Sequence, residues 1–188
     1  MPVMSEAAVA RLIQIAHPLD EFYARAGQPL PAMEFIDAED VPAPYKQLLV
    51  HDRDMTSTLE RFHEHRIHIH LLHRHETEHT YSREVVLELD ERNTPVEFGA
   101  IKIYLPSFPE HARERIVEAH SPLGRILKEF QLSYVSCPKA FLRIASDRLI
   151  SGALQLKGTH RLYGRCNRLS DPRGNPLADI VEILPPEK

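Results

Sequence analysis

The sequence RIHIHLLHRHETEHTYSREVVLELDERNTPVEFGAIKIYL, residues 66–105, contains three consecutive segments in which side chains alternate with a period of two. In the first segment, Ile67, Ile69 and Leu71 share one face of an extended chain. REVVLELD and EFGAIKIYL continue the same pattern, and the ERNTPV turn between them is short enough to join antiparallel neighbours. The stretch therefore predicts three strands in a meander.

Helical patterns lie on both sides of this stretch. Residues 27–44, rich in Pro and acidic side chains, are expected to form an irregular connection over the core. Thr56 is the expected cap of one helix, with Met55 at the bend before it, and Ser121 is the expected cap of another that has Pro122 at its first position. The predicted helices cover residues 5–17, 45–52, 56–65, 109–120 and 121–130.

Three more strand patterns complete the chain. They are AFLRIAS (140–146), HRLYGRCNRL (160–169) and LADIVEIL (177–184), and the SDPRGNP turn joins the last two. Runs of antiparallel strands with helices grouped between them indicate an α+β domain instead of a βαβ series. We therefore expect a single domain over residues 1–188, with one antiparallel sheet flanked by helices.

Composition limits the classes of function. The 188 residues, 43% of them hydrophobic, suit one domain with a full core. A net charge of -4 and the absence of a Lys/Arg run argue against a nucleic-acid partner. Cys137 and Cys166 form no CxxC pattern, which argues against a disulfide framework or a cysteine zinc cluster. No long apolar run suggests a signal sequence or a membrane segment, so we expect a cytoplasmic protein.

The segment HETEH, residues 75–79, matches the HExxH motif of zinc hydrolases. That motif works on a helix, where His75 and His79 would reach one zinc ion and Glu76 would act on its bound water. Here the segment is polar throughout and lies between two strand patterns, so a hairpin connection is the better interpretation and no metal is expected. A zinc-dependent hydrolase is retained as a remote alternative.

An ordered set of short motifs resembles the chorismate lyase family. The motifs are DRDMTSTLERF, YSREVVL, FGAIKIYLP, SPLGRIL, LYGRCNRL and PLADIVEILP. They cover about residues 48–185, which leaves residues 1–45 as a helical and irregular N-terminal extension. The resemblance implies a chorismate lyase-like fold, with a ligand pocket beneath flap segments. It also implies elimination of pyruvate from chorismate to give 4-hydroxybenzoate, without any cofactor.

The resemblance also implies which residues form the site. Arg83 matches the family's arginine that holds the aromatic carboxylate, and a planar guanidinium can do so with two parallel hydrogen bonds. Glu182 matches the acidic residue placed against the ring hydroxyl, so both residues are catalytic candidates. Met55 and Leu123 match apolar residues of the pocket, and Gly99 is similar to a glycine that leaves room near the ligand.

Arg165 is a further candidate for binding. In YGRCNRL it lies three residues from Arg168, so the two side chains point to opposite faces of a strand. Arg165 is the better candidate for contact with a second carboxylate, since chorismate carries two. The expected partner of the whole site is thus a small aromatic carboxylate, and the sequence does not indicate an oligomeric state.

Each assignment has an alternative. Arg83 would be structural if it paired with Glu84 or Glu88 at the surface, and Glu182 would be so if it faced solvent. At the level of the whole chain, the alternative to a lyase is a non-catalytic, sensor-like domain of the same fold that binds aromatic acids. Such sensors carry a DNA-binding module in front, which residues 1–45 are too short and too acidic to supply.

Two departures from the family bear on the pocket. The connection before YSREVVL is reduced to about TEHT, where the family has a longer flap, so we expect a more open pocket. Residues 147–160 form extra chain between FLRIAS and LYGR. We expect this insertion to remodel the pocket mouth or to form a subunit contact.

Overall fold

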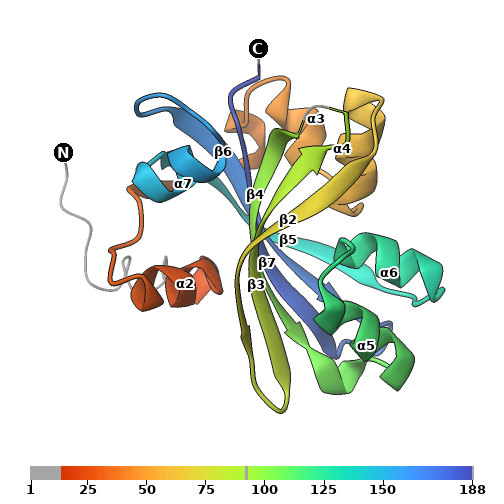
Figure 1. Ribbon diagram of the computed structural model, residues 1–188. Helices are drawn as coiled ribbons and strands as arrows, with labels where there is room; N and C mark the ends of the chain where they lie inside the picture. The colour runs from red at the N-terminus through yellow and green to blue at the C-terminus, as the bar shows by residue number, and fades with distance from the viewer. Residues whose placement is uncertain (1–13, 92, 188) are drawn as a thin grey trace.

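The computed structural model describes residues 14–91 and 93–187, which form one antiparallel sheet with helices on both faces (Figure 1). The seven strands of this part of the chain are arranged in the order β1-β5-β6-β7-β4-β3-β2. Their bounds are β1 (Met33–Ile36), β2 (Ile67–Glu76), β3 (Thr80–Leu89), β4 (Thr94–Tyr104), β5 (Val135–Ala145), β6 (Arg161–Ser170) and β7 (Pro176–Leu184). The predicted α+β fold with a single antiparallel sheet is confirmed.

The predicted meander is the part of the sheet formed by β2, β3 and β4. In its register Ile69 lies opposite Leu87 and Val85 lies opposite Gly99. The HETEH segment completes β2 and turns the chain into β3, with the Thr77 amide donating to the Thr80 carbonyl at 2.8 Å. The prediction of a hairpin in place of a helix is therefore confirmed, and the period of two explains it.

The described helices are short and cover both faces of the sheet. They are α2 (Leu19–Arg25), α3 (Tyr45–Leu49), α4 (Met55–His63), α5 (Glu110–Glu118), α6 (Leu123–Glu129) and α7 (Arg148–Ala153), with 3-10 turns η1 (Ala38–Asp40) and η2 (Leu105–Ser107). The helix predicted from residue 5 onward lies largely outside the described residues. None of the helices in the described ranges is long and apolar enough to cross a membrane.

Two predicted helix caps are wrong by one or two residues. Asp54, not Thr56, caps α4, because its Oδ1 accepts the Ser57 amide at 2.8 Å, and Met55 is the first helical residue. Pro122 is the residue before α6, so Ser121 lies outside the helix.

β1 lies in a segment expected to be irregular, and α7 lies in the insertion expected at the pocket mouth or a subunit contact, where it instead packs on the sheet face opposite the pocket. Within residues 27–44, β1 pairs with β5, and Glu34 forms an ion pair with Arg143 across the two strands at 2.6 Å. Its four residues are too few to show a period against the surrounding prolines. Residues 147–160 contain α7, whose first turn is capped by Asp147, with Oδ1 accepting the Ile150 amide at 2.9 Å.

The apolar core is divided by the sheet. One face packs under α2 and α7, which lie together on one side in Figure 1, and includes Val86, Phe98 and Val181. The other face carries two separate clusters. One packs under α5 and α6 around Ile103, and the other packs under α3 and α4 around Leu59. The middle of that second face lies between the clusters, where polar side chains gather.

Gly164 of β6 marks a close approach between strands. A Cβ on Gly164 would lie 2.5 Å from the backbone oxygen of Glu182 on β7, and backbone cannot move aside without disturbing the ladder. We predict that Gly164→Ala lowers the free energy of unfolding by about 3 kcal/mol. Gly152→Ala is the control, because no atom lies within 4 Å of its added Cβ and alanine favours helix, so it should raise stability by up to about 1 kcal/mol. Urea unfolding followed by circular dichroism measures both, and equal effects would contradict the packing described for β6.

Candidate ligand-binding site

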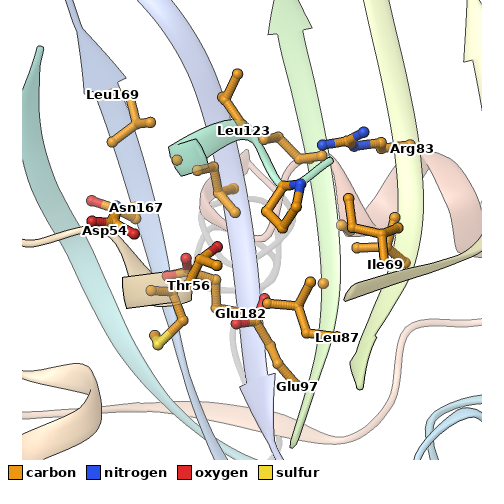
Figure 2. A pocket seen from close by; sticks show the side chains of 18 residues that line it. Asp54, Thr56, Ile69, Arg83, Leu87, Glu97, Leu123, Asn167, Leu169 and Glu182 are labelled. Carbon is orange, nitrogen blue, oxygen red and sulfur yellow. The ribbon is translucent and has the colours of Figure 1, made fainter. Parts of the chain in front are cut away.

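A pocket opens in the middle of the second sheet face, between the two apolar clusters (Figure 2). It encloses about 570 Å³ of space, a figure that includes space open to solvent. The sheet forms its floor, and the starts of α4 and α6 form its walls. Its lining consists of Asp54, Met55, Thr56, Ile69, Arg83, Val85, Leu87, Glu97, Gly99, Ala100, Ile101, Pro122, Leu123, Gly124, Asn167, Leu169, Ile180 and Glu182.

The strand period brings the polar lining residues together. Alternate residues of a strand share a face, so Arg83 of β3 lies on the same face as Val85, which is opposite Gly99. Gly99 is in turn opposite Glu182 of β7. Glu97 lies two residues from Gly99 on β4, on the same face. The floor therefore carries Arg83 toward one end and Glu97 toward the other, with Gly99 and the neighbouring Glu182 between them.

Arg83 is buried with only 2% of its surface exposed. Its Nη2 donates to the Ser121 carbonyl oxygen at 3.0 Å, whereas Nε and Nη1 have no partner among the described residues. Burial lowers the pKa of Arg83 to about 10, which still leaves it charged at neutral pH. The pocket thus contains a buried cation with unused donors.

The surface alternatives for Arg83 and Glu182 are wrong. Glu84 lies on the other face of β3, where it accepts from His73 on β2 at 2.7 Å, and Glu88 lies 3.3 Å from His68. Glu182 is only 4% exposed. Both site residues therefore belong to the interior, as the resemblance implied.

Arg165 has a different position from the one expected of a ligand contact. It is fully buried, is absent from the pocket lining and forms an ion pair with Glu182 through Nε. Its remaining nitrogens donate to the carbonyl oxygens of Leu49 and His51, at 3.2 and 3.0 Å, and of Arg53, at 3.2 Å. Arg165 thus holds the chain between α3 and α4 against the sheet instead of presenting donors to the pocket.

This arrangement also sets the charge of His51. The His51 ring lies beside Arg165, with Nδ1 accepting from the Arg53 amide at 3.1 Å and Nε2 positioned 2.7 Å from the Leu48 carbonyl oxygen. Burial and the nearby guanidinium lower the pKa of His51 to about 4. His51 is therefore neutral at neutral pH and adds no positive charge beside Arg165, which is paired with Glu182.

Glu97 lines the pocket but was not identified from the sequence. Its side chain is only 4% exposed, and Oε2 has no partner among the described residues. Burial and the charge of Glu182 raise the pKa of Glu97 well above its ordinary value, against a smaller opposing effect of Arg165. The signal was present in VEFGA, because Val96 and Phe98 flank this carboxyl as apolar residues flank Glu182.

The structure brings five of the six predicted site residues to the pocket. Met55 and Leu123 contribute apolar surface from opposite walls, and Gly99 joins Arg83 and Glu182 on the floor. A Cβ on Gly99 would lie 2.9 Å from Oε1 of Glu97, so the glycine leaves space that a side chain would fill. Their roles as ligand contacts stay predictions. Asp54 and Asn167, like Glu97, were not singled out from the sequence.

No histidine of β2 or of the turn after it lines this pocket. Within residues 14–91 and 93–187, no group of three or more His, Cys, Asp or Glu side chains is arranged to hold a metal ion. His75 belongs to β2 and His79 to the turn that follows. The helix that the zinc motif requires does not form.

The sequence matches no protein-family model and no curated protein at a significant level. Solved structures resemble the fold at low identity. PhnF from Mycobacterium smegmatis is 10% identical, over 97% of this chain and 86% of that one, with a TM-score of 0.54. A gene product of Staphylococcus aureus is 10% identical, over 63% and 82%, with a TM-score of 0.51.

A third similar structure is described as a ligand-binding domain. It belongs to a protein from Bordetella bronchiseptica assigned to the GntR family of transcriptional regulators. It is 13% identical, over 64% of this chain and 86% of that one, with a TM-score of 0.50. The present chain has the chorismate lyase-like fold that these regulator domains share.

The raised pKa of Glu97 predicts a pH-dependent effect of Glu97→Gln. The unfolded carboxyl ionises near 4.5 and the folded one well above it, so the native state loses stability as pH rises through that window. The free energy of unfolding of Glu97→Gln, relative to that of the wild type, should therefore increase as pH rises, by up to about 1.4 kcal/mol per pH unit within the window. Urea unfolding at pH 4.5, 6 and 8 measures this.

The control for that experiment is Glu34→Gln. Arg143 lowers the pKa of this exposed carboxyl, so its effect should run in the opposite direction. A Glu97→Gln effect that stays constant between pH 4.5 and pH 8 would show that Glu97 is ionised in the folded protein.

Proposed function

We propose that this protein binds a small aromatic molecule with one carboxylate, and that Arg83 holds the carboxylate. The observation that carries the proposal is the buried guanidinium whose Nε and Nη1 lack protein partners. An unpaired buried charge is costly, and a bound carboxylate would supply its counter-charge and an acceptor that it lacks. Nε and Nη1 donate on different sides of the guanidinium, so a contact with two parallel bonds would use one of them together with a hydrogen of Nη2, whose other hydrogen bonds to Ser121.

The charges of the pocket favour a monoanion. Arg83 is the one cationic side chain among the lining residues that the structure describes, whereas Asp54, Glu97 and Glu182 are acidic. Arg165, the nearest other guanidinium of the described chain to Glu182, is occupied by that carboxylate and by backbone carbonyls. A second carboxylate on the ligand would therefore face acidic groups without a cation to bind it.

The remaining lining favours a flat apolar body. Ile69, Val85, Leu87 and Leu123 contribute aliphatic surface, and the absent side chain of Gly99 leaves room over the centre of the floor. An aromatic ring would bury its faces against such walls, which is favourable by the hydrophobic effect. The resemblance of the Bordetella bronchiseptica ligand-binding domain supports binding as the function over catalysis.

A second candidate is the chorismate lyase reaction implied by the motif resemblance. Two carboxyl groups in one pocket favour it, because one could accept a proton and the other donate one. Glu182 would take the ring proton beside the breaking C–O bond while Glu97 protonates the departing enolpyruvyl oxygen. The released products would be pyruvate, after tautomerisation of its enol, and 4-hydroxybenzoate. The single lining cation places this reaction second, since chorismate is a dianion.

Ligand binding tests the first proposal. We predict that benzoate and 4-hydroxybenzoate raise the melting temperature of the wild-type protein, because they bind the folded state alone. Arg83→Ala should raise the dissociation constant measured by calorimetry at least about 30-fold, since it removes one partner of a buried charge pair. Arg83→Lys should recover only part of the affinity, because it keeps the charge and loses the planar donors. Equal affinity of wild type and Arg83→Ala would sink the proposal.

Arg83 should also reduce the stability of the ligand-free protein. Arg83→Met keeps much of the volume of the side chain and removes its unpaired charge, at the cost of the hydrogen bond to Ser121. We expect the free energy of unfolding to rise by about 1–3 kcal/mol, which urea unfolding without ligand would measure. A destabilised Arg83→Met variant would indicate that Arg83 supports the fold.

The lyase reaction is tested with purified protein and chorismate. If the second candidate holds, 4-hydroxybenzoate and pyruvate will form in equal amounts, and both Arg83→Ala and Glu182→Gln will reduce the rate at least about 100-fold. Saturable binding of hydroxybenzoates without product from chorismate would rule out the lyase reaction and support binding as the function.

A further inference from the structure

Glu97 is the one buried carboxyl of the pocket lining with an oxygen that lacks a partner among the described residues. Its Oε2 is shielded from solvent, and Oε1 lies above the position that a Gly99 side chain would occupy. Glu97 is only 4% exposed, and it belongs to the pocket lining. A buried polar atom without a partner is costly, so a group that enters the pocket has an interaction to gain there.

The neighbouring ion pair decides which carboxyl carries charge. Glu97 and Glu182 lie on adjacent strands and near one another in Figure 2. Arg165 bonds directly to Glu182 and makes no bond to Glu97. Two close carboxylates with one bound cation favour ionisation of the paired one and a proton on the other, in agreement with the raised pKa of Glu97. This arrangement favours Glu97 as a hydrogen-bond donor to a ligand and leaves Glu182 bound to Arg165.

Glu97 lies at the end of the floor away from Arg83, and Glu182 lies opposite Gly99, between these two levels. In the register of β3 and β4, Arg83 is opposite Ile101, whereas Glu97 is opposite Leu87, four residues further along. Four residues of strand correspond to about 13 Å, which the inward reach of both side chains shortens. Figure 2 shows Arg83 and Glu97 at opposite ends of the lining. A ring whose carboxylate lies on Arg83 would direct its far end toward Glu97.

We propose that Glu97 is a specificity-determining residue, whose carboxyl group donates a hydrogen bond to an oxygen on the ligand opposite its carboxylate. This inference rests on the proposed binding of an aromatic monocarboxylate. A hydroxyl group suits the position, because it can accept from Glu97 and donate to Glu182 at the same time. A bare ring leaves both carboxyl groups without a ligand partner, and a second carboxylate meets the charge of Glu182.

Calorimetry with three probes tests the role of Glu97. The wild type should bind 4-hydroxybenzoate about tenfold more tightly than benzoate, and benzene-1,4-dicarboxylate more weakly than benzoate. Glu97→Gln should keep the preference for the hydroxyl, because its amide still donates. Glu97→Leu should reduce it to about twofold or less. Glu78→Leu, in the exposed turn after β2, is the control and should leave the preference unchanged.

Infrared difference spectroscopy tests the proton on Glu97 without any ligand. Wild type minus Glu97→Gln should show the band of a protonated carboxyl group at pH 7, and a carboxylate band alone would overturn the proposal. A tenfold preference that persists in Glu97→Leu would also overturn it. If the wild type binds none of the probes, the proposed function fails with the ligand half of this inference, whereas the infrared band still decides the protonation half.

Discussion

The ion pair between Arg165 and Glu182 is the interaction on which the rest of the site depends. It joins β6 to β7 and, through the carbonyl oxygens that accept from Arg165, fixes the chain that leads from α3 into α4. That chain carries Met55 into the pocket wall. The same pair occupies the guanidinium of Arg165, and the charge of Glu182 joins burial in raising the pKa of Glu97. Arg83 is then left as the sole lining cation of the described chain.

The position of the pocket follows from how the core is divided. Two apolar clusters cover the ends of one sheet face under separate helix pairs, and neither extends across the middle. The middle is occupied by charged side chains and by Gly99, which cannot fill the space. Buried charges of this kind cost stability and persist where a function needs them. The centre of this sheet face is thus less well packed than its ends and contains charged side chains instead.

Much of the fold could be predicted from local pattern. The strand patterns identified β2, β3, β4, β5, β6 and β7, although β5 begins at Val135, five residues before its predicted start, and the turn residues indicated how neighbours pair. β1 was not predicted because four residues beside prolines show no period, and the start of α4 shifted because the Asp54 carboxylate accepts the Ser57 amide. Such choices depend on tertiary position, which the sequence does not display.

The site could be predicted only in part, for a related reason. Strand alternation correctly places Arg165 on the face of the pocket, but it does not say what stands in front of a side chain. The chain from Leu49 to Arg53 lies there and takes its donors. Glu97 was missed because no motif marks it, although its apolar neighbours in VEFGA already indicated burial. Arg83 and Glu182 were found through the motif resemblance, since charge and period alone allowed a solvated surface for both.

The most direct measurement is a crystal structure of the protein with 4-hydroxybenzoate. We expect the carboxylate to lie within hydrogen-bond distance of Arg83 Nε or Nη1, the ring to lie over Gly99, and the hydroxyl to lie between Glu97 and Glu182. Arg165 should keep its bonds to Glu182 and the backbone. A ligand found elsewhere, or one in this pocket with its carboxylate turned away from Arg83, would show that Arg83 does not hold the carboxylate.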